Sequence, residues 1–172
     1  SAVTPVSSYD IFRDASATKL GSTDSSTTVY NDITAVPGTS YSYTVKANFG
    51  NLASGTTPAS IGYRALATPT PPTASKGDYI GTGGVEGIEV VWSTVIGATG
   101  YDVYRDSEAT KIGSPAGTTL KFIDSTASIT ESHVYRIRAT TSVATSPFSG
   151  NSNAGWIGIG MTAEVRATRT FA

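Results

Sequence analysis

The sequence predicts an all-β protein built from two β-sandwich domains in tandem, and two patterns lead to that prediction. Short runs with apolar residues at alternate positions recur along the chain, separated by clusters of Gly, Pro, Asn, Asp and Ser. The runs are rich in β-branched and aromatic residues, which favour strands. The second pattern is an internal repeat of domain size. Because helical periodicity is hard to find, a sandwich or barrel is favoured over a mixed fold.

The repeat has a constant offset of 92 residues. The stretch "YDIFRDASATKLGS" at Tyr9–Ser22 returns as "YDVYRDSEATKIGS" at Tyr101–Ser114. The match continues without a gap through four further pairs: Asp32 with Asp124, Tyr43 with Tyr135, Val45 with Ile137, and Ala47 with Ala139. An offset of this size is close to the roughly 100 residues of one sandwich domain.

The expected strands follow the chain in order. The first copy contributes Tyr41–Asn48, in which Tyr41, Tyr43, Val45 and Ala47 fall on one face and should line the core. It ends in a strand within Ala59–Leu66. The second copy contributes Ile88–Val95, Tyr101–Asp106 and Val134–Thr140, and ends in a strand within Ala154–Met161. Ile88, Val90, Trp92, Tyr101 and Val103 are the expected inward residues there.

These strands resemble those of bacterial fibronectin type III domains. The residues that carry the resemblance are "VEGIEVVWS", "GATGYDVYRD", "LKFIDS" and "VYRIRAT" in the second copy, and "VPGTSYSYTVKA" in the first. The resemblance implies strands named A to G, and it places Tyr41 at the family's tyrosine corner, whose hydroxyl bonds back to the backbone. His133 replaces this tyrosine in the second copy, where we expect a structural role. The fold hosts many functions, so the resemblance implies little about activity.

The predicted domain limits follow from the repeat. Residues 1–67 form an incomplete domain with strands C to G, and residues 68–73 form a proline-rich linker. Residues 74–161 form a complete domain in which "GTGG" at Gly81–Gly84 is a turn between strands A and B. Residues 162–172 form a C-terminal strand or tail.

The first copy lacks counterparts of strands A and B, because Ser1 aligns with Ser93, one residue after Trp92. Such a domain would leave its core and one strand edge open to another chain. The predicted donor strand is the tail segment whose alternate residues are partly apolar, inserting into a neighbouring subunit by β-strand addition. Its residues are Glu164, Val165, Arg166, Ala167, Thr168, Arg169, Thr170 and Phe171. The alternative is that the chain is a slice of a longer tandem array.

A second candidate site is a surface binding patch on the second domain, formed by Tyr104, Arg136 and Arg138. Tyr104 should point outward from its strand and lie across from Arg136, so the two would form a cation–π pair. The patch could bind a sugar or a protein. It could equally be an ordinary cross-strand pair.

Composition narrows the functional classes. The net charge is −1, with no basic surplus for nucleic acid, and no apolar run is long enough to span a membrane. The chain has no Cys and a single His, so thiolate metal sites are excluded and no nucleophilic triad is defensible. We therefore expect no catalytic site, no metal and no cofactor.

The predicted function is an extracellular structural subunit of a cell-surface filament that assembles head to tail with itself by donor-strand complementation. Carbohydrate or other cell-surface proteins are further candidate partners. The alternative is a spacer or accessory binding module of a large secreted polysaccharide-active enzyme or adhesin. A filament subunit would form large oligomers, whereas a spacer would be monomeric.

Overall fold

The computed structural model describes residues 5–77, 87–129 and 131–157, and the secondary structure in these ranges is entirely β. Contacts divide the chain into two compact units, Ser1–Ala65 and Leu66–Ala172. The fold class predicted from the sequence is confirmed. No helix capable of crossing a membrane occurs among these residues. The predicted tail strand and the "GTGG" turn lie outside the described residues.

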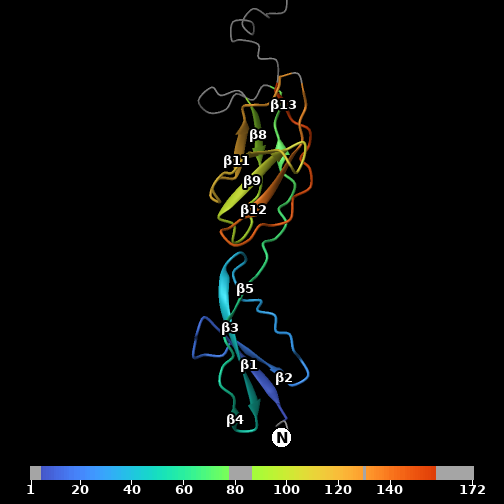
Figure 1. Ribbon diagram of the computed structural model, residues 1–172. Helices are drawn as coiled ribbons and strands as arrows, with labels where there is room; N and C mark the ends of the chain where they lie inside the picture. The colour runs from blue at the N-terminus through green and yellow to red at the C-terminus, as the bar shows by residue number, and fades with distance from the viewer. Residues whose placement is uncertain (1–4, 78–86, 130, 158–172) are drawn as a thin grey trace, which may run out of the picture. The chain divides into compact units, whose positions relative to one another are not determined.

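The first unit is a single antiparallel sheet (Figure 1). The strand order is β2-β1-β3-β4, and β5 also pairs with β3. The strands are β1 (Ser8–Arg13), β2 (Gly21–Asp24), β3 (Ser40–Phe49), β4 (Leu52–Ala53) and β5 (Ser60–Tyr63). β1 and β3 run side by side with Ile11 opposite Val45. No second sheet covers this one within the part of the unit that the structure describes.

The second unit has the two sheets of a sandwich (Figure 1). The first has the order β10-β9-β12, the second has the order β11-β8-β6, and β7 pairs in parallel with β13. The strands are β6 (Thr73–Ala74), β7 (Lys76–Gly77), β8 (Ile88–Val91), β9 (Gly100–Arg105), β10 (Lys111–Gly113), β11 (Lys121–Asp124), β12 (Tyr135–Thr140) and β13 (Trp156–Ile157).

The core of the second unit lies between its two sheets. Its fully buried side chains alternate along β8, β9 and β12, as a half-buried strand requires. The five inward residues expected from the sequence, Ile88, Val90, Trp92, Tyr101 and Val103, all belong to one buried cluster. The Trp92 and Tyr101 rings pack with centroids 5.4 Å apart. The predicted inward face of this domain is therefore confirmed.

Serine side chains extend the hydrogen bonding of β12. Ser146, Ser149 and Ser152 recur every third residue beside the strand, and each donates its backbone N–H to a carbonyl of β12. Each Ser Oγ also accepts the N–H of that same strand residue, at 2.9 Å for Ala139, 3.0 Å for Ile137 and 2.9 Å for Tyr135. The segment thus satisfies both backbone groups of alternate strand residues without forming a regular strand.

Candidate functional site

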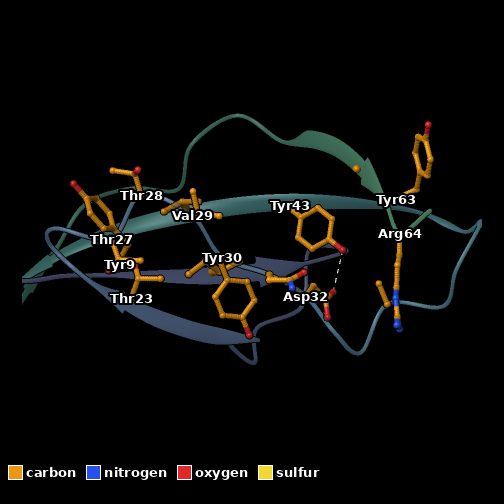
Figure 2. Close-up of a pocket in the computed structure, with 15 residues that line it drawn as sticks. Tyr9, Thr23, Thr27, Thr28, Val29, Tyr30, Asp32, Tyr43, Tyr63 and Arg64 are labelled. Atoms are coloured by element: carbon orange, nitrogen blue, oxygen red, sulfur yellow. Dashed lines mark hydrogen bonds between the residues drawn. The ribbon is translucent and has the colours of Figure 1, made fainter. Parts of the chain in front are cut away.

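The sheet of the first unit carries a cavity of about 550 Å³ (Figure 2). Its floor comes from β1 and β3, and one wall comes from the segment between β2 and β3. The lining residues include Tyr9, Ile11, Val29, Tyr30, Asp32, Tyr43 and Val45. The volume is many times the roughly 30 Å³ that one water molecule occupies in the liquid.

The same positions are closed in the second unit. The inward residues of β3 are only half-buried, whereas their repeat partners in β12 are fully buried; the pairs are Tyr43 with Tyr135, Val45 with Ile137, and Ala47 with Ala139. Tyr43 and Val45 line the cavity, on the face predicted to be inward, but their burial is incomplete. In the second unit β8 supplies Ile88, Val90 and Trp92 to the shared cluster. The described part of the first unit has no counterpart of β8.

The segment Val29–Asp32 is the repeat partner of β11, yet it forms no strand. β11 pairs with β8 along its whole length, from Lys121 opposite Val91 to Asp124 opposite Ile88. Without such a partner, the backbone of Val29–Asp32 has no ladder to join. Val29 is 74% exposed, and its repeat partner Lys121 is exposed in β11 as well.

A buried carboxylate holds one end of this segment. Asp32 Oδ2 accepts a hydrogen bond from the Tyr43 hydroxyl at 3.0 Å (Figure 2) and another from Arg13 Nη1 at 2.8 Å. Oδ1 accepts the N–H and hydroxyl of Thr34 at 2.9 and 2.7 Å. Burial alone would raise the pKa of Asp32, but the bonds from Thr34, Tyr43 and Arg13 outweigh it and lower the pKa to about 2.

The second unit repeats this arrangement around Asp124. Its carboxylate accepts hydrogen bonds from Arg105 and from the Tyr135 hydroxyl, each at 2.9 Å, and from Thr126. Burial favours a raised pKa for Asp124, and the hydrogen bonds from Thr126, Arg105 and Tyr135 reverse it, so the pKa is lowered. Burial, together with the charge of Asp124, raises the pKa of Tyr135. The recurrence of the cluster in a complete sandwich indicates a structural role.

An aromatic ring holds Val29–Asp32 at a second point. The Tyr30 ring lies over Gly21 of β2, so closely that a Cβ at Gly21 would overlap it. Phe122 covers Gly113 of β10 in the same way. The Tyr30 hydroxyl also donates to the Leu20 carbonyl at 3.3 Å. Tyr30 and Asp32 therefore keep this segment beside the sheet, although it pairs with no strand in the described structure.

The predicted patch of Tyr104, Arg136 and Arg138 is assembled differently from the expectation. Tyr104 and Arg136 are cross-strand partners, as predicted. However, Arg138 lies over the Tyr104 ring, 5.4 Å from its centroid, while Arg136 pairs with Glu108. Arg138 Nη2 also donates to the Tyr104 hydroxyl at 2.9 Å.

Tyr104 is covered on the outer face of its strand, so the predicted surface patch does not expose its ring. Phe148 packs edge-on against the Tyr104 ring, with the centroids 4.9 Å apart, and only 7% of Tyr104 is exposed. The alternation of the strand places Tyr104 on the outer face correctly. A distant loop residue then covers it, which the strand pattern could not reveal. A ligand would therefore find little of this ring accessible.

The two corner positions also differ. The Tyr41 hydroxyl accepts the Val36 N–H at 3.2 Å, which confirms the predicted bond back to the backbone. His133 is buried, and its Nδ1 lies 2.7 Å from Asp106 Oδ2. Its backbone pairs with Gly155. Within the described ranges, no group of three or more His, Cys, Asp or Glu side chains is placed to hold a metal ion.

The sequence reasoning missed the carboxylate clusters and the serine ladder. The repeat had aligned Asp32 with Asp124, but the role of these residues also depends on Arg13, Tyr43 and their counterparts, which become neighbours only in the folded sheet. The Ser-x-x-Ser-x-x-Ser spacing of Ser146–Ser152 was the available signal for the ladder.

The sequence was compared with protein-family models and with curated proteins. No protein-family model matches the chain. It is 31% identical over 189 aligned positions to Exoglucanase B of Cellulomonas fimi, an alignment that covers 94% of this chain and 17% of that protein. The chain therefore spans about a sixth of the length of this relative.

Solved structures resemble it as well. A segment of two fibronectin type III domains from chicken tenascin matches with a TM-score of 0.55 and 15% identity, covering 84% of this chain and 81% of that one. Fibronectin(III)-like modules of Clostridium thermocellum CbhA match with a TM-score of 0.40 and 16% identity, covering 92% of this chain and 81% of that one.

Proposed function

Since the chain consists of fibronectin type III-like domains in tandem, we propose that it is a non-catalytic, extracellular module of a polysaccharide-active enzyme. In that role it would space or support the working domains of the longer protein. This is the alternative function considered for the sequence. A supporting role is compatible with a sandwich fold in which each unit contains a hydrogen-bonded structural carboxylate.

One observation carries the proposal. The similarity to Exoglucanase B runs through nearly the whole of this chain but occupies only 17% of that protein. A module within a longer protein would produce this relation, because a tandem of sandwich domains can be joined to many different domains in one chain.

The chemistry of the described residues is compatible with a supporting role. The carboxylates with lowered pKa, Asp32 and Asp124, are saturated by hydrogen bonds from neighbouring side chains. A general acid needs a proton near neutral pH and access to substrate. These two carboxylates instead stay ionised and are enclosed within their clusters.

A chimera tests this function. Exoglucanase B is compared with a variant in which its matched segment is deleted and with one in which this chain replaces that segment. Hydrolysis of a soluble and an insoluble glucan is measured for all three. We expect deletion to reduce activity on the insoluble glucan while activity on the soluble one is kept, and this chain to restore the loss. Failure to restore it, or hydrolysis by the isolated chain, would contradict the proposal.

The open face of the first unit favours a second function, self-assembly into a surface filament. In this proposal the donor segment Glu164–Phe171 of one copy enters the open face of the next, as the alternation of Val165, Ala167 and Phe171 suggests. Head-to-tail contacts of this kind produce open filaments unless the rotation closes a ring.

Sedimentation separates the two functions. A filament subunit should form large species that persist on dilution, and deletion of residues 162–172 should convert them to monomers. A spacer module should sediment as a monomer with or without these residues. Assembly that survives the deletion would exclude the donor segment.

A further inference from the structure

The serine segment beside β12 satisfies its own hydroxyls as well as the backbone of the strand. In each of its three contacts a serine donates its backbone N–H to a β12 carbonyl and accepts the N–H of the same β12 residue on its Oγ. We call this pair of bonds a hydroxyl rung. Each serine hydroxyl then donates to the next carbonyl of its own segment, at Pro147 (2.7 Å), Gly150 (2.8 Å) and Asn153 (2.6 Å). The hydroxyl of a rung therefore both accepts and donates within the protein.

Hydroxyl rungs of the same kind occur at other sheet edges. Ser75, which directly follows β6, forms a rung with Glu89 of β8, and both bonds are 2.9 Å long. The first unit has two more rungs on β3, with bonds of 2.9–3.1 Å, which join Ser54 to Ala47 and Thr57 to Val45. In the described structure each rung belongs to a segment at the end of the strand order of its sheet. The rungs are thus a feature of sheet edges.

An amide side chain bonds the edge of β6 in a related way. The Ala74 N–H donates to Asn153 Oδ1 at 3.0 Å, and the Ala74 carbonyl accepts a bond from Asn153 Nδ2 at 2.8 Å. Asn153 directly follows Ser152, the last serine of the β12 rungs. One short segment, Ser146–Asn153, therefore bonds edge strands of both sheets of the second unit.

The serine segment is spaced differently from a strand. Its rungs recur every third residue, whereas the β12 residues that they contact recur every second residue; the pairs are Ser146 with Ala139, Ser149 with Ile137, and Ser152 with Tyr135. A regular edge strand would present its own row of N–H and C=O groups to a further strand. A segment of period three offers no such row, and Pro147 has no N–H to contribute. The segment therefore closes the edge of β12 without creating a new edge.

Edges of this kind are a hazard for a tandem repeat, because matching strands can exchange or mispair. β1 and β9 are near copies of each other, so each molecule carries two strands that fit the same place. We propose that the hydroxyl rungs, together with Asn153, protect the sheet edges from β-strand addition by a second copy of this chain. This device goes beyond the spacer role, and it concerns other edges than the segment Val29–Asp32.

Removal of one hydroxyl tests the protection. In Ser149→Ala the backbone bond to the Ile137 carbonyl remains, but the Ile137 N–H loses its acceptor. The segment should then leave the edge of β12 more often. We expect the Ile137 amide to exchange its hydrogen about tenfold faster in the folded chain, and the variant to self-associate as its concentration rises.

Amide exchange observed by NMR measures the opening of the edge, and sedimentation velocity measures the association. Thioflavin T fluorescence reports whether the associated form contains added β-pairing. Each quantity is compared with that of the unmodified chain, so that any assembly through the C-terminal donor segment is present in both samples.

Two controls isolate the hydroxyl. Ser149→Thr keeps a hydroxyl at the same place, as Thr57 does in the first unit, so it should exchange and sediment like the unmodified chain. Ile88→Val weakens the core of the second unit and leaves the rungs intact. It is compared with Ser149→Ala at urea concentrations that unfold equal fractions of the two, where it should show no added association.

A second edge provides the test if Ser149→Ala does not fold. Ser75→Ala removes the acceptor for the Glu89 N–H at the edge of β8, and Ser75→Thr is its matched control. The same association is expected for Ser75→Ala and its absence for Ser75→Thr.

Three results would overturn the proposal. They are a folded Ser149→Ala, or Ser75→Ala in its place, that sediments like the unmodified chain at every concentration; equal association of the matching Thr variant; and equal association of Ile88→Val at matched unfolding. The last result would assign the association to lost stability alone. None of them decides the chimera experiment, so edge protection and the spacer role can fail separately.

Discussion

At the scale of single residues, the two carboxylate clusters allow the most direct predictions of how a substitution changes the free energy of unfolding. Each joins an arginine, a tyrosine and a threonine around one Asp, and Asp124 is the more deeply buried of the two, with 1% of its side chain exposed against 7% for Asp32. A buried carboxylate that loses its partners, or an arginine that loses its carboxylate, is left with an uncompensated polar group. We therefore expect replacement of either aspartate by a neutral residue to lower the stability of the unit that contains it.

Asp124→Asn should destabilise the second unit by about 3 kcal/mol, because the Arg105 guanidinium loses its counter-ion in a partly buried site. Urea unfolding followed by tryptophan fluorescence measures this unit alone, since both tryptophans, Trp92 and Trp156, lie in it. Glu108→Gln is the matched control: its pair with Arg136 is exposed and should contribute less than about 1 kcal/mol. Equal losses for both variants would contradict the assignment.

The stability of the first unit should fall in acid. The pKa of Asp32 is lowered from 3.8 to about 2 in the folded chain. Its ionised form therefore stabilises the fold fully above the unfolded pKa, and this contribution is lost as the pH falls from about 4 toward 2. Urea midpoints at several pH values, read from the amide NMR signals of β3, measure this loss. In Asp32→Asn the same decline should be flatter; an unchanged decline would assign it to other groups.

At the scale of elements, strand positions were read well from the sequence, while strand neighbours were not. The alternation within Tyr41–Asn48 correctly located β3 at Ser40–Phe49, because alternation follows from the backbone geometry of a strand. One strand edge of the first copy was expected to be open, but Val29–Asp32, the segment at that edge, forms no strand. A strand needs a partner for its hydrogen bonds, and the described part of the first unit offers that edge no partner.

The serine ladder should be important for β12. Ser149→Ala removes the acceptor for the buried Ile137 N–H, which is bonded at 3.0 Å. Leaving this donor without its partner should cost the second unit about 1–3 kcal/mol, measured by tryptophan fluorescence in urea. Ser125→Ala, at an exposed turn position next to β11, should change the free energy of unfolding by less than about 0.5 kcal/mol. A neutral Ser149→Ala would show that water replaces the hydroxyl.

At the scale of the whole molecule, the two units differ in how completely they bury their apolar residues. Among the described residues, the first unit has many large exposed apolar side chains, among them Val29, Ile33, Leu52 and Ile61, each at least 70% exposed. The second unit has a fully buried cluster between two sheets. Because burial of apolar area is the main favourable term in folding, the first unit should be the less stable.

Unfolding should therefore occur in two steps. We expect the amide NMR signals of β1 and β3 to disappear at a lower urea concentration than that at which tryptophan fluorescence reports unfolding of the second unit. A single transition shared by both probes would show instead that the two units unfold together.

The all-β class, the tandem repeat and the direction of the alternating side chains in the second unit could be predicted from the sequence alone, because alternation and repetition can be read from the order of residues along the chain. Only the tertiary structure decided that Phe148 covers Tyr104, that Arg138 rather than Arg136 lies over its ring, and that Tyr30 and Asp32 hold the open edge in place. These contacts join residues far apart in the chain, and their formation depends on which segments fold back over each face of the sheet.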